Sequence, residues 1–304
     1  MVMLPMKFGK SKLFLLTFFA FGIRIWKLGE VPLSNVDGPF FARISSALAG
    51  VAIVLLIYSI AVKLFKKPIN EKIALWSAFW VAATPLLIVE SRIVSEPMRA
   101  TFMLLGLFAV TIYFVKSLKH QLLALLLFFG ISLISYPSAW IFHIEKMPTF
   151  SQFLTQFFKL ASFEFLFFNN DSFWWGGMRA MGVMLPIMVI PFLVGVYGFI
   201  FWIDARARNL LGVTIIFLSI FAALSPLLPE SREILLVVPF LCMVLGIGSA
   251  FIQRRLVSLG KIGLAIGVIS LFFVLYQWLI FWRLYTVHHA ARISSEIDYV
   301  KVDY

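Results

Sequence analysis

The chain has 304 residues, of which 62% are hydrophobic and 13% are charged, and its mean hydropathy is +0.99. Soluble domains carry roughly 45–50% apolar and about 25% charged residues, so the composition excludes an ordinary soluble protein and indicates a polytopic membrane protein. The net charge is +12, yet no basic stripe with interleaved aromatic residues lies outside the apolar runs, so no nucleic-acid partner is expected. The single cysteine, Cys242, excludes an internal disulfide and a CxxC metal or redox site.

Apolar stretches that approach the roughly 17 to 25 residues of a membrane-spanning helix recur along the chain. The first could be a secretory signal peptide, but Arg24, Trp26 and Lys27 stand where a small-residue cleavage site would be, which favours a retained anchor. The sequence thus predicts an all-α, polytopic membrane helix bundle with one domain over residues 1–304. Its nine spans are expected at 12–30, 44–62, 73–89, 100–115, 121–142, 183–203, 209–228, 234–252 and 262–282.

The distribution of basic residues predicts the orientation, because Lys and Arg favour short cytoplasmic loops. With a cytoplasmic N-terminus, the only carboxylates on the cytoplasmic side are Glu71 and Asp204, and all others fall on the external side. We therefore expect an integral plasma-membrane protein whose active face is external. The external segments would be the loops 31–43, 90–99, 143–182 and 229–233 and the C-terminal tail 283–304.

The longest segment outside the spans contains an amphipathic pattern. Phe150, Phe153, Leu154 and Phe157 recur at i, i+3, i+4 and i+7, while Ser, Gln, Thr and Lys occupy the other face. Such a pattern is typical of a helix that lies flat in the membrane interface. We expect this helix on the external surface.

Polar residues cluster at the external ends of the predicted spans. Each cluster has an ordinary explanation: Asp37 and Arg43 belong to a loop with turn residues, and the ten residues from Glu90 to Arg99 could form a self-neutralising set of ion pairs. Trp174 and Trp175, which follow Asn170 and Asp171, could be interfacial anchors, and Arg232 a boundary charge.

The same residue types also suit a transferase that uses a lipid-phosphate-linked sugar. Arginine can hold phosphate oxygens in bidentate fashion, a carboxylate can take a proton from a hydroxyl acceptor, and aromatic rings can stack on a sugar. There is no GxxxxGK[ST] motif and no GxGxxG after a strand, and the adjacent His288 and His289 lack the i, i+4 spacing of a metal site. No nucleotide or redox cofactor is therefore expected, and no ligand spacing argues for a metal, although carboxylates alone could recruit one.

The order of the motifs resembles the GT-C membrane glycosyltransferases of the protein O-mannosyltransferase and aminoarabinose-transferase type, also described as family-39-like. The resemblance rests on weak motifs in a consistent order, which are 24–32 with Asp37, 41–50, Pro85 with 90–96, 132–139, 165–171, and 229–232 with Pro239. The chain departs from the family in two respects: Asp37 is followed by Gly38 rather than Glu, and the first external loop and the middle of the chain are shortened.

The resemblance implies roles for individual residues. Asp37 takes the position of the catalytic base, and Glu96 that of the second acid after the Ser-Arg motif. Arg92, Arg232 and Arg43 are expected to bind the donor phosphate. Residues expected to contact substrate are Glu90, Tyr136, Asn170, Asp171, Trp174 and Trp175.

The expected function is transfer of a sugar from a polyprenyl-phosphate-linked donor to a glycan, lipid or protein acceptor on the non-cytoplasmic face. The partners would be that donor, the acceptor and the bilayer. Two alternatives stay open at this stage: a transporter or lipid flippase, and a catalytically inactive GT-C relative. Carriers of the alternating-access type tend to show repeated halves and ionisable groups near the midplane, whereas here no repeat is visible and the charges lie at helix ends.

Overall fold

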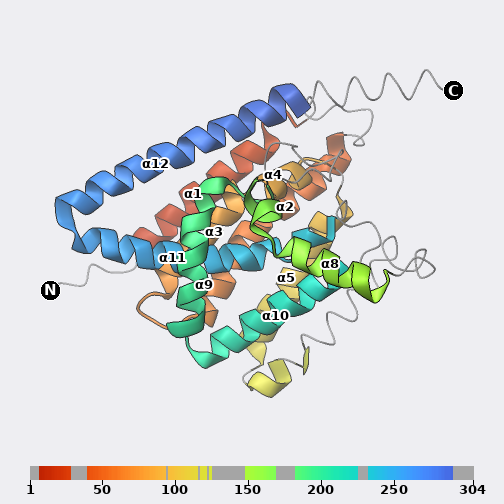
Figure 1. Ribbon diagram of the computed structural model, residues 1–304. Helices are drawn as coiled ribbons and strands as arrows, with labels where there is room; N and C mark the ends of the chain where they lie inside the picture. The colour runs from red at the N-terminus through yellow and green to blue at the C-terminus, as the bar shows by residue number, and fades with distance from the viewer. Residues whose placement is uncertain are drawn as a thin grey trace.

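The computed structural model describes residues 7–28, 40–93, 95–115, 117–121, 123–124, 148–168, 182–224 and 232–289. All regular secondary structure within these ranges is helical, which confirms the all-α prediction (Figure 1). The helical elements are α1 (Lys7–Ile25), α2 (Phe40–Leu64), α3 (Asn70–Ala83), α4 (Pro85–Ser91), α5 (Glu96–Phe114), α8 (Phe150–Leu160), η2 (Glu164–Phe168), η3 (Pro186–Met188), α9 (Val189–Phe201), α10 (Ala205–Ala223), η4 (Arg232–Leu236), α11 (Val238–Ser258), α12 (Gly260–Arg283) and η5 (Leu284–His289).

Five helical stretches in the described part of the chain are long and apolar enough to cross a membrane. They are Arg43–Leu64, Pro97–Phe114, Ala205–Ala223, Ile234–Ser258 and Gly260–Val287. The predicted span 183–203 corresponds to a shorter apolar helix, Pro186–Phe201, and the predicted span 12–30 overlaps α1. Most of the predicted span 121–142 lies outside the described residues. The structure thus supports a helical membrane protein with fewer established spans than the nine expected.

The predicted continuous span 73–89 is interrupted. α3 ends at Ala83, Thr84 is extended with ψ 123°, and Pro85 opens α4. A proline disfavours helical backbone at the residue before it, so the sequence Thr84-Pro85 ends one helix and starts another. The Thr84 hydroxyl still donates a 2.6 Å hydrogen bond to the carbonyl oxygen of Trp80, one turn back. The span is therefore two helices joined at Thr84.

The centre of the bundle is α11, which packs against both α3 and α9. The carbonyl oxygen of Pro191 lies so close to Gly248 that a Cβ there would be 1.9 Å from it, and a Cβ at Gly246 would be 2.0 Å from the Ser77 Oγ. Small residues allow membrane helices to approach in this way, because packing rather than a hydrophobic driving force holds them together in lipid. Two glycines on different faces of α11 thus set its contacts with α9 and α3.

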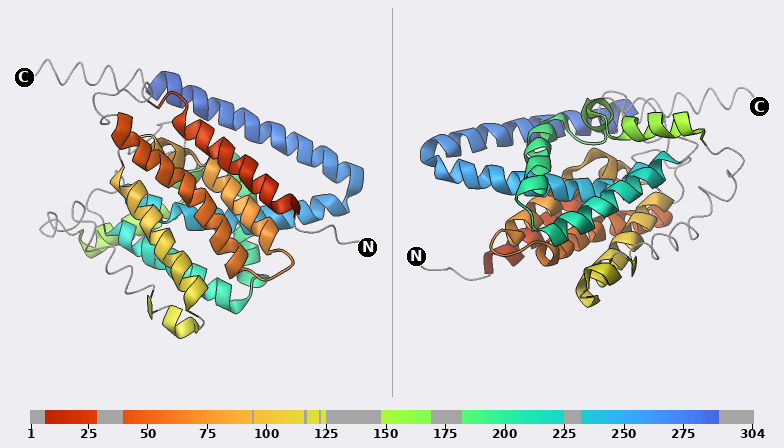
Figure 2. Two further views of the ribbon diagram at one scale, coloured as in Figure 1. Left: turned by 180° about the vertical axis from the view of Figure 1, so that it is seen from behind. Right: turned by 60° about the horizontal axis from the view of Figure 1, so that its bottom comes forward.

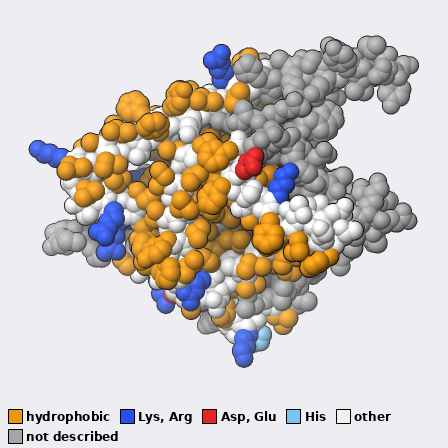
Figure 3. Space-filling view, in the orientation of Figure 1, with side chains coloured by type: hydrophobic (Ala, Val, Ile, Leu, Met, Phe, Trp, Pro, Cys, Tyr) orange, Lys and Arg blue, Asp and Glu red, His pale blue; other side chains and the backbone are white. Residues whose placement is uncertain are grey.

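By contrast, α12 lies on the outside of the bundle and runs beside α1 (Figures 1 and 2). Its buried residues are Gly263 and Phe281, and most of the others are exposed. Its contacts with α1 are made by aromatic rings, with centroid distances of 5.7 Å between Phe19 and Trp278 and 5.4 Å between Trp26 and Trp282. The apolar side chains that cover much of the surface in Figure 3 are those expected of a protein whose surroundings are lipid.

The predicted interfacial helix is present as α8. Its N-terminus carries a capping box, in which the Thr149 hydroxyl accepts from the Gln152 amide N–H and the Gln152 side chain accepts from the Thr149 N–H. Phe150 and Phe158 are exposed and Leu160 is buried, and α8 packs on α10 (Figure 1). The helix itself is confirmed, while its external location stays a prediction.

Three helical hairpins turn at one end of the bundle. There, Lys66 after α2 lies 3.8 Å from Asp204 between α9 and α10, and Trp76 of α3 donates a 3.0 Å hydrogen bond to Gln253 near the end of α11. This end carries basic residues that the sequence assigns to the cytoplasmic side. They are Lys63, Lys66, Lys67, Lys72, Arg206, Arg208, Arg254, Arg255 and Lys261. We refer to it as the basic end.

Candidate active site

Four charged side chains are fully buried at the other end of the bundle, where α1 ends, α2 begins and α4 turns into α5. They are Arg24, Arg43, Glu90 and Arg92. Burying a charge costs free energy unless the charge is paired and hydrogen-bonded, so the partners of each of these side chains matter for the stability of the fold. Three of the four were predicted as site residues, and the structure brings those three together.

Arg92 holds the C-terminal turn of α1. Its Nη1 donates to the carbonyl oxygens of Ile23 at 2.7 Å and of Arg24 at 3.4 Å. Its Nη2 donates to the carbonyl oxygen of Lys27 at 3.3 Å. The last carbonyls of a helix have no partner within the helix and carry partial negative charge, so a guanidinium is well suited to this position.

The other side of the Arg92 guanidinium meets two aromatic rings. It lies 5.8 Å from the ring centroid of Trp282 and 5.6 Å from that of Tyr285, within the range of cation–π attraction. Tyr285 is fully buried in η5, which continues from α12. Arg92 therefore joins α1 to the far end of α12.

Arg43 ties together the two ends of the predicted catalytic loop. Its Nη1 donates a 3.0 Å hydrogen bond to the carbonyl oxygen of Leu28, the last described residue before that loop. Lys27 just before it has φ 50°, a left-handed conformation that costs a non-glycine residue roughly 1–2 kcal/mol. Hydrogen bonds from Arg92 to the Lys27 carbonyl and from Arg43 to the Leu28 carbonyl hold this turn in place.

Glu90 and Ser95 connect α4 to the start of α5. The Ser95 hydroxyl donates a 2.6 Å hydrogen bond to Glu90 Oε2 and accepts one from the Met98 amide at 3.2 Å, as an N-cap residue does. The Ser95 amide in turn donates to Ser46 Oγ of α2 at 3.1 Å. Glu90 thus takes part in a buried polar chain that fixes the turn preceding Glu96.

Arg24 packs against Gly50 of α2. A Cβ at Gly50 would lie 2.7 Å from both Arg24 Nε and Ser91 Cβ, so only glycine fits between them. Arg24 Nη2 donates to the carbonyl oxygen of Val81 in α3 at 3.4 Å, whereas Nε makes no hydrogen bond within the described residues. Gly50 and Ser91 belong to two of the motifs on which the family resemblance rests, and the structure explains both by close packing.

The remaining predicted residues are less closely defined. Glu96 opens α5 and Arg232 opens η4, two elements that pack on each other, but the structure describes only their backbone. Within the described residues, no group of three or more His, Cys, Asp or Glu side chains gathers that could hold a metal ion. The residues that lie outside the described part of the chain are Asp37, Tyr136, Asn170, Asp171, Trp174 and Trp175.

Sequence reasoning missed the residues that complete this cluster. Ser46, Trp282 and Tyr285 are distant in sequence from Arg92 and Ser95; Ser46 lies within the motif 41–50 but was not singled out, and no motif marks the other two. Ser95 had a detectable signal, because a serine followed by Glu96-Pro97 is a typical helix start.

A family of known proteins matches the segment that contains three of these buried charged residues. Residues 29–135 match the model of the dolichyl-phosphate-mannose-protein mannosyltransferase family. No curated protein and no solved structure matches the chain. The matched segment contains α2 to α5 and includes Arg43, Glu90 and Arg92. The family resemblance expected from the motifs is thus confirmed for this segment, residues 29–135.

Proposed function

We propose that the protein transfers a mannosyl residue from a polyprenyl-phosphate carrier to a hydroxyl group, with a protein as the favoured acceptor. The acceptor oxygen forms a bond to the anomeric carbon, and the bond from that carbon to the carrier phosphate breaks. A carboxylate takes the acceptor proton, and arginine stabilises the charge that builds on the departing phosphate. The support for this activity is the family match over residues 29–135.

The observation that carries the proposal is the anchoring of the loop that contains Asp37. The hydrogen bond from Arg43 of α2 to the carbonyl oxygen of Leu28 joins the described residues on the two sides of this segment. Arg92 fixes the preceding turn, and the Glu90–Ser95 hydrogen bond fixes the start of α5 where Glu96 lies. We propose Asp37 as the general base and Glu96 as the second acid, supported by these hydrogen bonds of the residues that flank Asp37 and Glu96 in the sequence.

The described contacts favour different roles for the different arginines. Arg92 and Arg43 donate to backbone carbonyls, and both side chains are fully buried among the helices that they connect. We propose that these two arginines position the loop, and that Arg232, at the start of η4 next to α5, is the donor-phosphate ligand. Tyr136, Asn170, Asp171, Trp174 and Trp175 are retained as proposed substrate contacts.

The wider architecture is proposed on the same basis. We propose one domain over residues 1–304 with nine spans, a cytoplasmic N-terminus and the site on the external face of the plasma membrane. The separation of the basic end from the Arg92 cluster supports this orientation, because basic residues favour the cytoplasmic side.

The test is an assay of both products. Purified full-length protein in liposomes is given polyprenyl-phosphate mannose with a labelled sugar, together with a peptide rich in Ser and Thr. We expect label in the peptide and an equal amount of free polyprenyl phosphate. A variant lacking both proposed acids, Asp37→Asn with Glu96→Gln, should be inactive, whereas the control Glu71→Gln at the basic end should retain activity. Wild-type protein that is folded and forms neither product would refute the proposal.

One observation favours the carrier alternative. The break between α3 and α4 at Thr84 resembles the interrupted helices of transporters. The partners of the Thr84 hydroxyl, however, are the Trp80 carbonyl and Cys242, and neither is a charged group that would bind an ion. A carrier would move labelled lipid-linked sugar across sealed vesicles without releasing free carrier phosphate, and that result distinguishes the two functions.

A further inference from the structure

The basic end contains a cavity that the proposed transfer reaction does not use. It has a volume of about 660 Å³ and lies between α9 and the C-terminal end of α11. Its wall from α9 consists of Val194 and of Trp202, which follows the helix, and its wall from α11 consists of residues within 251–258. This volume falls within the range of roughly 300–1,000 Å³ that is usual for ligand sites.

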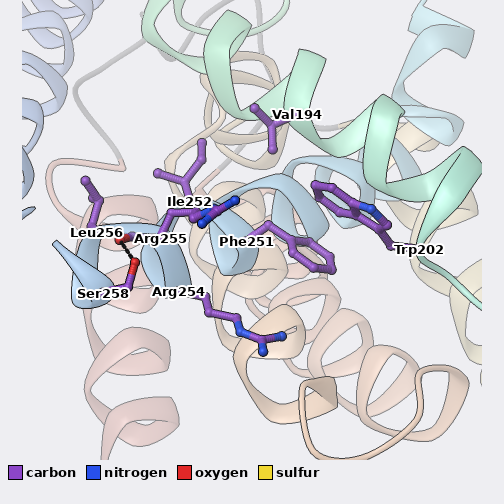
Figure 4. A pocket seen from close by; sticks show the side chains of 8 residues that line it. All are labelled: Val194, Trp202, Phe251, Ile252, Arg254, Arg255, Leu256 and Ser258. Carbon is purple, nitrogen blue, oxygen red and sulfur yellow. Dashed lines mark hydrogen bonds between the residues drawn. The ribbon is translucent and has the colours of Figure 1, made fainter.

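The inner wall of the cavity is apolar. The rings of Trp202 and Phe251 have centroids 4.1 Å apart, and Val194, Ile252 and Leu256 complete the surface (Figure 4). Gly195 and Gly248 bring α9 and α11 into close contact nearer the middle of the bundle. Towards this end the two helices leave an apolar space, with a lining suited to a hydrocarbon chain.

The outer part of the cavity is basic. Arg254 and Arg255 both line it and are exposed; in Figure 4 the Arg255 side chain extends towards Ile252, and that of Arg254 extends away from them. Their charges add to those of the basic end, where the carboxylates in the described residues are Glu71 and Asp204, and Asp204 already lies beside Lys66. An arginine near a helix C-terminus interacts favourably with the helix dipole. That interaction alone does not explain why two arginines line an apolar cavity.

The apolar inner wall and the basic outer part together indicate which kind of molecule the cavity binds. An apolar cavity at a membrane edge accepts an acyl chain, and adjacent guanidinium groups accept phosphate oxygens. We propose that the cavity between α9 and α11 binds an anionic phospholipid, with an acyl chain against Trp202 and Phe251 and the phosphate at Arg254 and Arg255.

This site is separate from the proposed transfer site. The 24 residues of α12 connect the basic end to the Arg92 contacts, and at 1.5 Å per residue the helix is about 36 Å long. The sugar and phosphate of a donor bound at that end therefore lie outside the cavity. The proposal does not depend on transferase activity, so it can succeed or fail independently of the proposed function.

Trp202 provides a direct probe. Full-length protein is placed in nanodiscs of phosphatidylcholine that contain a small fraction of brominated phosphatidylglycerol or brominated phosphatidylcholine, and tryptophan quenching is measured. The difference between wild-type protein and Trp202→Phe isolates the quenching of Trp202 from that of the other tryptophans. We expect brominated phosphatidylglycerol to quench Trp202 at lower lipid fractions than brominated phosphatidylcholine.

Charge variants then test the arginines. The double variant Arg254→Gln/Arg255→Gln should lose the preference for phosphatidylglycerol, with apparent affinity falling about fivefold for each arginine removed. The matched control Lys67→Gln/Lys72→Gln removes two exposed charges from the same end without touching the cavity, and it should keep the preference. Val194→Phe, which fills the cavity and leaves both arginines, should abolish the quenching of Trp202 by either lipid.

Three results would overturn the proposal. Equal quenching of Trp202 by both brominated lipids would show a cavity without headgroup selection. An equal loss in the Lys67→Gln/Lys72→Gln control would show attraction to the basic end as a whole. Displacement of brominated phosphatidylglycerol by polyprenyl phosphate, but not by unlabelled phosphatidylglycerol, would assign the cavity to a carrier lipid. Each variant is accepted only if its elution on size-exclusion chromatography and its unfolding temperature match those of the wild type.

Discussion

Arg92 packs against Trp282, with its guanidinium carbon 5.8 Å from the ring centroid, although 190 residues separate the two in sequence. The same guanidinium donates to the carbonyl oxygens at the end of α1. α12 is otherwise largely exposed, so this contact and the neighbouring aromatic pairs attach its far end to the bundle. The Ser-Arg motif of the family segment is thus the place where α1, α4 and α12 meet.

Replacing Arg92 by Lys should lower stability even though the charge is kept. An ammonium cannot reproduce the planar fork that reaches the Ile23 and Lys27 carbonyls, and a hydrogen bond made by a charged group contributes about 1.5–3 kcal/mol. We expect a lower midpoint of thermal unfolding in detergent. Arg232→Lys is the comparison: it should leave stability near the wild-type value and weaken binding of the lipid-phosphate donor. Arg92→Lys with normal stability and weak donor binding would instead assign Arg92 to the phosphate.

The Glu90–Ser95 pair gives a second prediction. Ser95→Ala removes both the N-cap of α5 and the hydrogen bond to Glu90 Oε2, and loss of such a cap costs about 0.5–2 kcal/mol. Thr101→Ala is a suitable control, because its hydroxyl donates only to the carbonyl of Pro97 within the same helix. Chemical unfolding should show the larger loss for Ser95→Ala. Equal losses in the two variants would argue against a special role of the Glu90–Ser95 turn.

Two glycine variants test the close packing of α11. Gly248→Ala would bring a methyl group against the Pro191 carbonyl, and overpacking of this kind costs about 1–3 kcal/mol. Gly267→Ala in α12 places the same methyl group where no atom lies within 4 Å. We expect a reduced unfolding temperature for the first variant and an unchanged or slightly raised one for the second. If Gly248→Ala is as stable as the wild type, α9 and α11 do not pack as described.

Topology can be measured by cysteine labelling. Cys242 is buried against Thr84, so Cys242→Ser gives a background with no accessible thiol of its own. In this background, a membrane-impermeant thiol reagent should label Asp171→Cys and Glu230→Cys from outside. It should label Lys67→Cys, at the basic end, only after the membrane is opened. External labelling of position 67 in intact cells would reverse the proposed orientation.

The sequence predicted the helical class because the apolar runs and the period of α8 are local patterns. It did not predict the break at Thr84, since hydropathy alone takes no account of the backbone restriction that Pro85 imposes. Within the candidate site, the sequence identified Arg92 and Glu90 as residue types suited to chemistry. It could not show that Arg92 contacts α1 and Trp282, because those contacts depend on how distant helices pack.

The roles of the two acids differ in a measurable way. Glu96 begins α5 directly after Ser95, on a helix start that is fixed by hydrogen bonds, and we expect it to orient the acceptor. Glu96→Gln should therefore raise KM for the acceptor more than it lowers kcat. Donor binding should be unchanged in this variant. A Glu96→Gln variant without turnover, at saturating acceptor, would make Glu96 the base.

Sugar transfer should depend on Asp37, which lies between α1 and α2 in the sequence, and this dependence can be measured in a single-turnover assay of Asp37→Asn. The measurement is the rate of sugar transfer from polyprenyl-phosphate mannose to the acceptor peptide, with donor binding measured in parallel. A general base contributes roughly 10²- to 10⁴-fold, so the rate should fall by that factor while donor affinity stays near the wild-type value. Transfer by Asp37→Asn at the wild-type rate would contradict the account.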